Sequence, residues 1–184
     1  MQDYAVLLRG INVGGKNKIA MPELARCLES HGCRQVATYL NSGNVLLQSG
    51  DAAEALGPKL EAMLSQNFRL DTSLIKVLVL TKDELQAVAD AKPAGFGDEP
   101  EKYHSDVIFL MGMSAADALP VFQPREGVDT IWPGPGVIYS QRLSALRTKS
   151  RLSRIMGTPA YRSMTIRTWN TTTRLLELLG RPRA

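Results

Sequence analysis

The chain has 184 residues and a net charge of +4, and its 44% hydrophobic and 22% charged residues are typical of a soluble globular protein. Its length fits one ordinary domain or two small ones, and no apolar run approaches the roughly 20 residues that a membrane-spanning helix needs. The first residues lack the basic and apolar regions of a secretory signal, so we expect a cytoplasmic protein whose cysteines, Cys27 and Cys33, stay reduced.

The first 90 residues alternate between strand and helix patterns. The apolar run at 4–8 predicts a buried strand, and Pro22 and Gly32 mark the two ends of a helix. Thr81 and Glu84 form the capping box of a later helix that runs to about Ala89. Between them we predict strands at 35–40 and 45–48 around Asn41-Ser42-Gly43-Asn44, a helix marked by Leu56, Leu60, Met63 and Leu64, and a strand at 74–80.

Residues 91–104 are rich in proline, glycine and charge without an apolar period, which predicts a linker. The pattern then restarts, and no repeat is visible at the level of residues. The predicted elements are a strand at 107–111, a helix from Ser114 to Leu119, strands at 128–132 and 137–140, a basic helical stretch near 149–156, a strand near 164–167 and a helix from Thr168 to Leu179.

Both halves therefore read βαββαβ, which predicts the ferredoxin-like arrangement with strand order 4-1-3-2. The runs at 4–8 and 45–48 agree, because central strands buried on both faces lack alternation. We predict an α+β fold of two tandem ferredoxin-like (α-β plait) subdomains with extra connecting and C-terminal helices. The first covers 1–90 with its connecting helix, 91–104 is the linker, and the second covers 105–184 with the basic segment and terminal helix.

Two polar loops should meet at one end of the first sheet, because the strands that they follow run in the same direction. Their glycines, cations and amide side chains have the composition of an anion-binding site. The alternative is two ordinary turns, whose glycines supply positive φ and whose asparagines bond locally. The candidate residues are Arg9, Gly10, Asn12, Gly14, Gly15, Lys16, Asn17, Asn41, Ser42, Gly43 and Asn44.

The start of the final helix is a second candidate region. Thr168 is a predicted N-cap, and the first turn of a helix favours an anion. We add Arg167 and Asn170 to the candidate ligand-binding residues. The alternative is a plain capped helix with Trp169 in the core.

Other chemistries lack a residue that they need. The segment 10–16 fits G-x-x-x-x-G-K, but Asn17 stands where a Walker A loop has the hydroxyl that binds Mg²⁺. The cysteine pair with His31 has no fourth zinc ligand nearby, and the two histidines lie in different halves without a nucleophile elbow. We therefore expect no metal and no cofactor, and the sequence leaves open whether the protein is an enzyme.

The charge is unevenly distributed. Residues 141–184 carry ten basic side chains against the single acid Glu177, for a net charge of +9, whereas the first 140 residues carry −5. This asymmetry indicates an anionic partner for the C-terminal part, either a small molecule or nucleic acid. Alternatively, the acidic part of the chain neutralises the basic part. Val45-Leu46-Leu47 offers no aromatic ring for base stacking, so sequence-specific RNA recognition is not expected.

Three motifs carry a family resemblance: LRGINVGGKN at 8–17, TYLNSGNV at 38–45 and Thr-x-Arg-x-Trp-Asn-Thr at 165–171. They resemble the bacterial family called domain of unknown function 1697 over essentially the whole chain. The resemblance implies tandem ferredoxin-like subdomains and no established activity. In the third motif this family usually has asparagine where the chain has Thr168.

We expect a protein that binds an anionic ligand, a phosphate-bearing molecule or a nucleic-acid backbone, at the 9–18 loop and the 41–44 hairpin. A first alternative is an enzyme for a phosphorylated or acyl-phosphate substrate, by fold-level analogy with an acylphosphatase. A second is a structural or interaction protein without a ligand. A homodimer is possible in each case.

Overall fold

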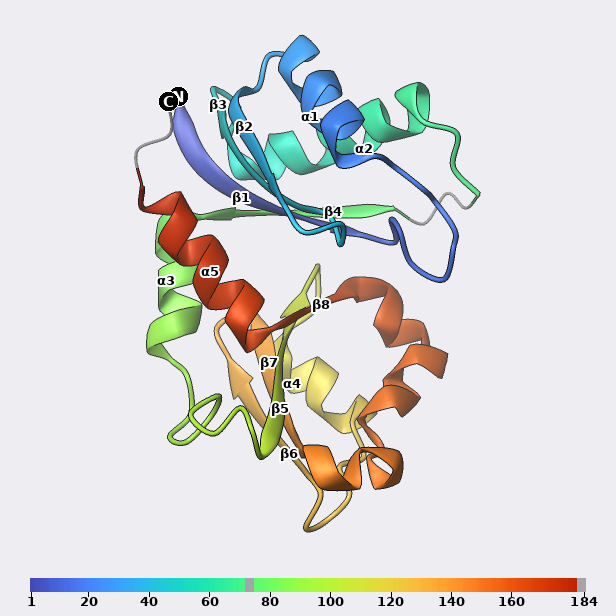
Figure 1. The fold of residues 1–184 in the computed structure, drawn as a ribbon, viewed down its shortest axis with the longest axis vertical. Coiled ribbons are helices and arrows are strands. Elements are labelled where there is room, and N and C mark those ends of the chain that lie inside the picture. The colour runs from blue at the N-terminus through green and yellow to red at the C-terminus, as the bar shows by residue number, and fades with distance from the viewer. Residues whose placement is uncertain (72–74, 182–184) are drawn as a thin grey trace. The chain divides into compact units, whose positions relative to one another are not determined.

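The computed structural model describes residues 1–71 and 75–181, and it contains two four-stranded antiparallel sheets (Figure 1). Their strand orders are β2-β3-β1-β4 and β6-β7-β5-β8, which is the predicted order in each half. The α+β fold of tandem ferredoxin-like units is thus confirmed. No helix among the described residues is long and apolar enough to cross a bilayer.

The chain divides into two compact units. The first is Met1–Leu85 with Arg174–Ala184, and the second is Gln86–Thr173. The final helix is divided between them, with the part from Arg174 onward grouped with the first unit.

The strands of the first unit are β1 (Gln2–Arg9), β2 (Arg34–Tyr39), β3 (Asn44–Ser49) and β4 (Lys76–Thr81). Residue 74 of the predicted fourth strand lies outside the described residues. Helices α1 (Met21–Ser30) and α2 (Ala53–Asn67) cover one face of the sheet (Figure 1). As predicted from the unbroken apolar runs, β1 and β3 are central, and residues 4–8 are at most 3% exposed.

Helix α3 (Lys82–Asp90) begins with the predicted capping box. The Thr81 N–H and Oγ1 donate to Glu84 Oε2 at 2.8 and 2.9 Å, and the Glu84 N–H donates to Thr81 Oγ1 at 3.2 Å. Two backbone donors that a helix leaves unsatisfied at its start are therefore bonded locally.

The second unit contains four strands, β5 (Tyr103–Leu110), β6 (Asp129–Gly134), β7 (Val137–Leu143) and β8 (Met164–Thr168). The short helix α4 (Ala115–Ala118) starts at the predicted cap, where Ser114 Oγ accepts from the Asp117 N–H at 3.1 Å. Helix α5 (Trp169–Leu179) follows β8 directly.

The basic stretch predicted as a helix near 149–156 forms 3-10 turns instead. They are η2 (Ser144–Lys149), η3 (Leu152–Gly157) and η4 (Pro159–Ser163), and a further turn, η1 (Leu119–Val121), follows α4. Gly157 and Pro159 follow the stretch directly and keep it from extending into a longer α-helix, because glycine and proline are the poorest helix formers.

The segment 91–104, predicted as a linker because it has no apolar period, contributes to the core. Phe96 is 0% exposed, and its ring packs edge-on against Trp132, Tyr139 and Trp169 at centroid distances of 6.1, 5.1 and 5.4 Å. Strand β5 also begins at Tyr103, inside the predicted linker. Phe96 belongs to no apolar period, so the sequence pattern does not reveal its burial.

Candidate functional site

The two polar loops predicted from the sequence do meet at one end of the first sheet. Asn12 Nδ2 donates to the Asn41 carbonyl at 2.9 Å, and the Leu8 N–H donates to the Gly43 carbonyl at 2.7 Å. Gly43 has a φ of 78°, and a Cβ there would lie 2.8 Å from Leu8 Cβ. Only glycine fits this close approach, so the contact between the loops depends on it.

Within the first loop, residues 12–17 form a small hairpin. The Asn12 N–H donates to the Asn17 carbonyl and the Lys16 N–H to the Val13 carbonyl, both at 3.1 Å. Gly14 and Gly15 have φ values of 59° and 76°, the sign that a type I′ turn requires at both central positions. The hairpin tip at 13–16 is exposed.

The asparagine side chains of this loop bind its own backbone. Asn12 Oδ1 accepts from the Ile19 N–H at 2.8 Å and Asn12 Nδ2 donates to the Ile19 carbonyl at 2.9 Å. Asn17 Nδ2 donates to the Gly10 carbonyl at 2.7 Å, while the Asn17 N–H donates to Asp71 Oδ2 at 2.6 Å. The backbone N–H of Asn17 therefore already donates to a carboxylate of this chain, that of Asp71.

The second loop is organised in the same way. Asn44 is 0% exposed, and its Nδ2 donates to the Tyr39 carbonyl at 2.9 Å and to Ser42 Oγ at 3.0 Å. Asn41 and Ser42 are exposed, whereas Arg9 on the neighbouring strand is half-buried. These hydrogen bonds fix the shape of the loops.

Arg167, predicted as a candidate ligand-binding residue at the start of the final helix, is buried on β8. Its Nη1 donates to Thr165 Oγ1 at 3.0 Å and to the Ile166 carbonyl at 2.8 Å, and burial lowers its pKa to about 10. Successive residues of a strand point to opposite faces, so Arg167 and Thr168 do not present their side chains to the same space.

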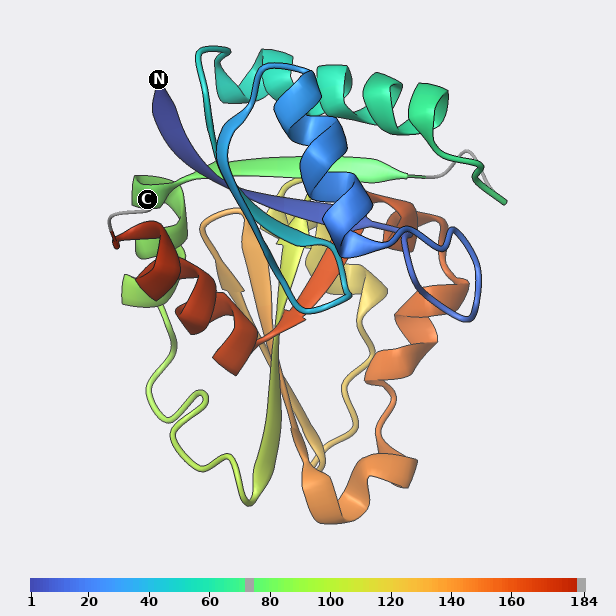
Figure 2. The ribbon, with the colours of Figure 1, turned by 45° about the horizontal axis from the view of Figure 1, so that its top comes forward.

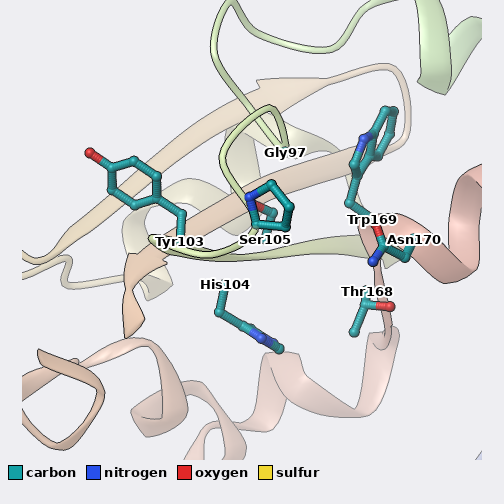
Figure 3. Close-up of a pocket in the computed structure, with 8 residues that line it drawn as sticks. Gly97, Tyr103, His104, Ser105, Thr168, Trp169 and Asn170 are labelled. Atoms are coloured by element: carbon teal, nitrogen blue, oxygen red, sulfur yellow. The ribbon is translucent and has the colours of Figure 1, made fainter. Parts of the chain in front are cut away.

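A cavity of about 200 Å³ lies in the second unit at the start of α5 (Figure 3). Two segments far apart in the sequence, 97–105 and 168–170, supply its walls. Of the predicted candidates, Asn170 is the residue that the structure places there. The lining residues are Gly97, Pro100, Tyr103, His104, Ser105, Thr168, Trp169 and Asn170.

His104 is held in place by charged neighbours on the sheet. Its Nε2 lies 3.1 Å from Asp106 Oδ1, and Arg142 Nη2 lies 3.7 Å from Asp106 Oδ2. The Asp106 side chain is 13% exposed, and burial raises its pKa although the charges of His104 and Arg142 oppose the shift. The imidazole is 41% exposed, so it can still reach a ligand.

The start of α5 forms another wall of this cavity. The Thr171 N–H donates to Thr168 Oγ1 at 3.2 Å, which confirms the predicted cap. Trp169 packs against Phe96, and a Cβ on Gly97, whose φ is 76°, would overlap the Trp169 ring. Glycine at 97 therefore lets the segment before β5 approach the helix closely.

Ser105 lies on the other side of β5 from His104, as Figure 3 shows. Ser105 Oγ donates to Gln141 Oε1 at 3.1 Å, and the Gly97 N–H donates to the same oxygen at 3.3 Å. The serine hydroxyl is therefore not aimed at the imidazole, and the two do not form a nucleophile–base pair.

The sequence analysis did not include His104 among the candidate ligand-binding residues, because it assigned 91–104 to a linker and began the next strand at 107. A signal is nevertheless present: His104 and Asp106 are two residues apart, so extending the strand to Tyr103 places both on one face.

Comparison with known proteins shows the relationship directly. Residues 1–139 match the family described as protein of unknown function, DUF1697. The chain belongs to the DUF1697 family. It is similar to the conserved bacterial protein SP0830 from Streptococcus pneumoniae, with 26% identity and a TM-score of 0.80, over 96% of this chain and 98% of that one. No curated protein matches it. The family resemblance carried by the motifs is thus confirmed.

A second cavity of this DUF1697 protein, of about 350 Å³, lies in the first unit between His31, Asp51 and α2. Its charged residues pair with each other, since Lys59 Nζ lies 2.7 Å from Asp51 Oδ2. Burial raises the pKa of the Cys33 thiol, which keeps it neutral and weakly nucleophilic. Within residues 1–71 and 75–181, no three His, Cys, Asp or Glu side chains are placed to hold a metal.

Asp106 should couple the stability of this DUF1697 protein to pH. Because its pKa in the folded state is raised above the unfolded value of about 3.9, ionising it is less favourable in the folded protein. Its contribution to the free energy of unfolding should therefore fall as pH rises from about 4 through the raised pKa. Asp106→Asn removes this contribution. Over that pH range, the free energy of unfolding of the variant should therefore rise relative to that of the wild type. Urea unfolding at a series of pH values measures it, and parallel profiles would contradict the assignment.

Proposed function

We propose that this DUF1697 protein binds a small molecule with a carboxylate or phosphate group in the cavity at the start of α5. The observation that carries the proposal is the cavity itself, whose lining takes His104 and Asn170 from segments far apart in the sequence. Pockets with a few convergent polar groups are the usual binding sites of small molecules.

The chemistry of the lining supports an acidic ligand. The imidazole of His104 lies against the Asp106 carboxylate, and Arg142 offsets the charge of that carboxylate from its other oxygen. Asn170 adds a carboxamide at the first turn of a helix that is 11 residues long, and such a turn favours an anion. Trp169 adds an apolar wall.

The size of the cavity limits the ligand. Its volume of about 200 Å³ is below the roughly 300 Å³ at which pockets for drug-sized molecules begin, so a compact acid or the acidic end of a longer molecule fits. Because Ser105 is not paired with His104, the arrangement supports binding rather than a reaction with a serine nucleophile.

We place the proposed anion-binding site at the cavity and not at the 9–18 loop. The side-chain amides of Asn12 and Asn17 donate to backbone carbonyls, whereas His104 and Asn170 line the cavity. Lys16 at the exposed hairpin tip is the residue of the loop that best tests the other location.

Thermal shift and calorimetry with inorganic phosphate, acetate and a panel of phosphorylated and carboxylated metabolites test the proposal. A ligand at 100 times its Kd should stabilise the wild-type protein by about 2.7 kcal/mol. We expect His104→Gln to weaken binding at least about tenfold, the loss of one hydrogen bond to a charged group.

His31→Gln is the matched control, because His31 is the other histidine and is exposed in the first unit. It should bind as the wild type does, and so should Lys16→Ala. If His104→Gln and the wild type had equal affinity for every ligand that binds, the assignment of the binding site to this cavity would be refuted. Loss of binding in Lys16→Ala would place the ligand at the hairpin tip.

A further inference from the structure

Between β7 and β8 the chain passes through the 3-10 turns η2 to η4, shown in orange and red-orange in Figure 2. We call residues 144–163 the basic segment. It contains no acidic residue. Its exposed basic side chains are Arg147, Lys149, Arg151, Arg154 and Arg162.

These five cations are not neutralised by ion pairs. Among residues 1–71 and 75–181, no carboxylate lies within 4 Å of any of them, since every ion pair of that range involves other residues. Arg174 and Arg181, further along the chain, do pair with Glu177. The charge of the basic segment is therefore directed to solvent, where it attracts anions.

The core holds the basic segment in place. Leu152 and Ile155 are 4% and 3% exposed and pack in the hydrophobic cluster of the second sheet. The Arg151 N–H donates to Asp129 Oδ2 at 2.8 Å, which ties the start of η3 to β6. Because the backbone is fixed, less conformational entropy is lost when Arg151 and Arg154 meet a partner.

The positions of the apolar residues indicate which of two polyanions, a membrane surface or nucleic acid, the basic segment fits. An amphipathic segment binds a membrane surface through an exposed apolar face, but Leu152 and Ile155 point into the core. Met156, at 58%, is the exposed large apolar side chain of the segment. Exposed cations without an apolar face fit a row of phosphates in water better than a bilayer.

We propose that the basic segment binds the phosphate backbone of nucleic acid without reading its sequence. Phosphate contacts position a protein on a duplex but carry no sequence information. The one aromatic residue of the segment, Tyr161, is half-buried, so the segment presents no exposed ring for stacking on bases. The proposal does not depend on the cavity at α5.

Fluorescence anisotropy with two labelled 20-base-pair DNA duplexes of unrelated sequence tests the proposal, using the full chain. With four or five phosphate contacts, raising salt from about 50 to about 200 mM should weaken binding roughly 100- to 500-fold. Both duplexes should bind equally. Arg151→Gln with Arg154→Gln should lower the slope of log affinity against log salt by about 1.8, which is the expected change for two contacts.

Arg26→Gln with Arg34→Gln is the matched control, because it removes the same charge from two exposed arginines of the first unit. It should leave the slope nearly unchanged. An equal loss in both double variants would show an effect of net charge alone and overturn the assignment. Absence of binding at low salt would overturn it too, as would tighter binding of phosphatidylserine vesicles than of duplex through the same two arginines. Loss of binding of small acids in His104→Gln would not affect this result.

Discussion

Phe96→Ala is expected to lower the free energy of unfolding of the second unit by about 3–5 kcal/mol. The Phe96 ring is 0% exposed and lies edge-on against Trp132, Tyr139 and Trp169. Truncation removes the apolar contact and leaves a cavity among the three rings, which adds to the cost. Edge-to-face aromatic pairs also contribute about 0.5–1.5 kcal/mol each beyond the burial of area.

The two tryptophans of the chain make this measurement specific. Both Trp132 and Trp169 contact Phe96, so their fluorescence during urea unfolding reports on this cluster. Phe68→Ala, at a half-buried site in the first unit, is the control and should cost clearly less. If 91–102 behaved as a surface linker, Phe96→Ala would change stability by less than about 0.5 kcal/mol, and the burial of this ring would be refuted.

Asp129→Ala is expected to destabilise the second unit by about 2–4 kcal/mol, because it leaves two backbone donors without their acceptor. Asp129 is 7% exposed, and its Oδ2 accepts from the Arg125 N–H at 3.0 Å and the Arg151 N–H at 2.8 Å. One carboxylate oxygen thus joins the loop before β6 to the basic segment.

Asp129→Asn separates the loss of the acceptor from the loss of charge. Its amide oxygen can still accept from a backbone N–H, so we expect less than half the destabilisation of the alanine variant in the same fluorescence assay. In Asp129→Ala, duplex binding should also weaken, since Arg151 loses its anchor. Equal stability of the alanine variant and the wild type would show that these two hydrogen bonds do not hold the segment.

The two loops show how much of a candidate site can be predicted from residue composition. Glycines, asparagines and lysines at 9–18 and 41–44 indicated a ligand site, and the meeting of the two loops followed correctly from strand direction. The hydrogen bond from the Asn17 backbone N–H to the Asp71 carboxylate, 54 residues away, could not be predicted from composition. Turn-forming and ligand-binding asparagines have the same donors and acceptors, so only the partner in space distinguishes them.

The sequence alone determined the features of this protein that arise from local interactions and from the apolar period. This class includes the capping box at Thr81 and the ends of α1, because each depends on residues that are neighbours along the chain. It also includes the order of strands in both sheets, because that order follows from which strands are fully buried. Tertiary structure alone decided the burial of Phe96, the partners of the asparagines and the cavity beside His104. Those features arise where segments distant in the sequence pack together, and a polar or aromatic side chain carries no local sign of which distant group it will meet.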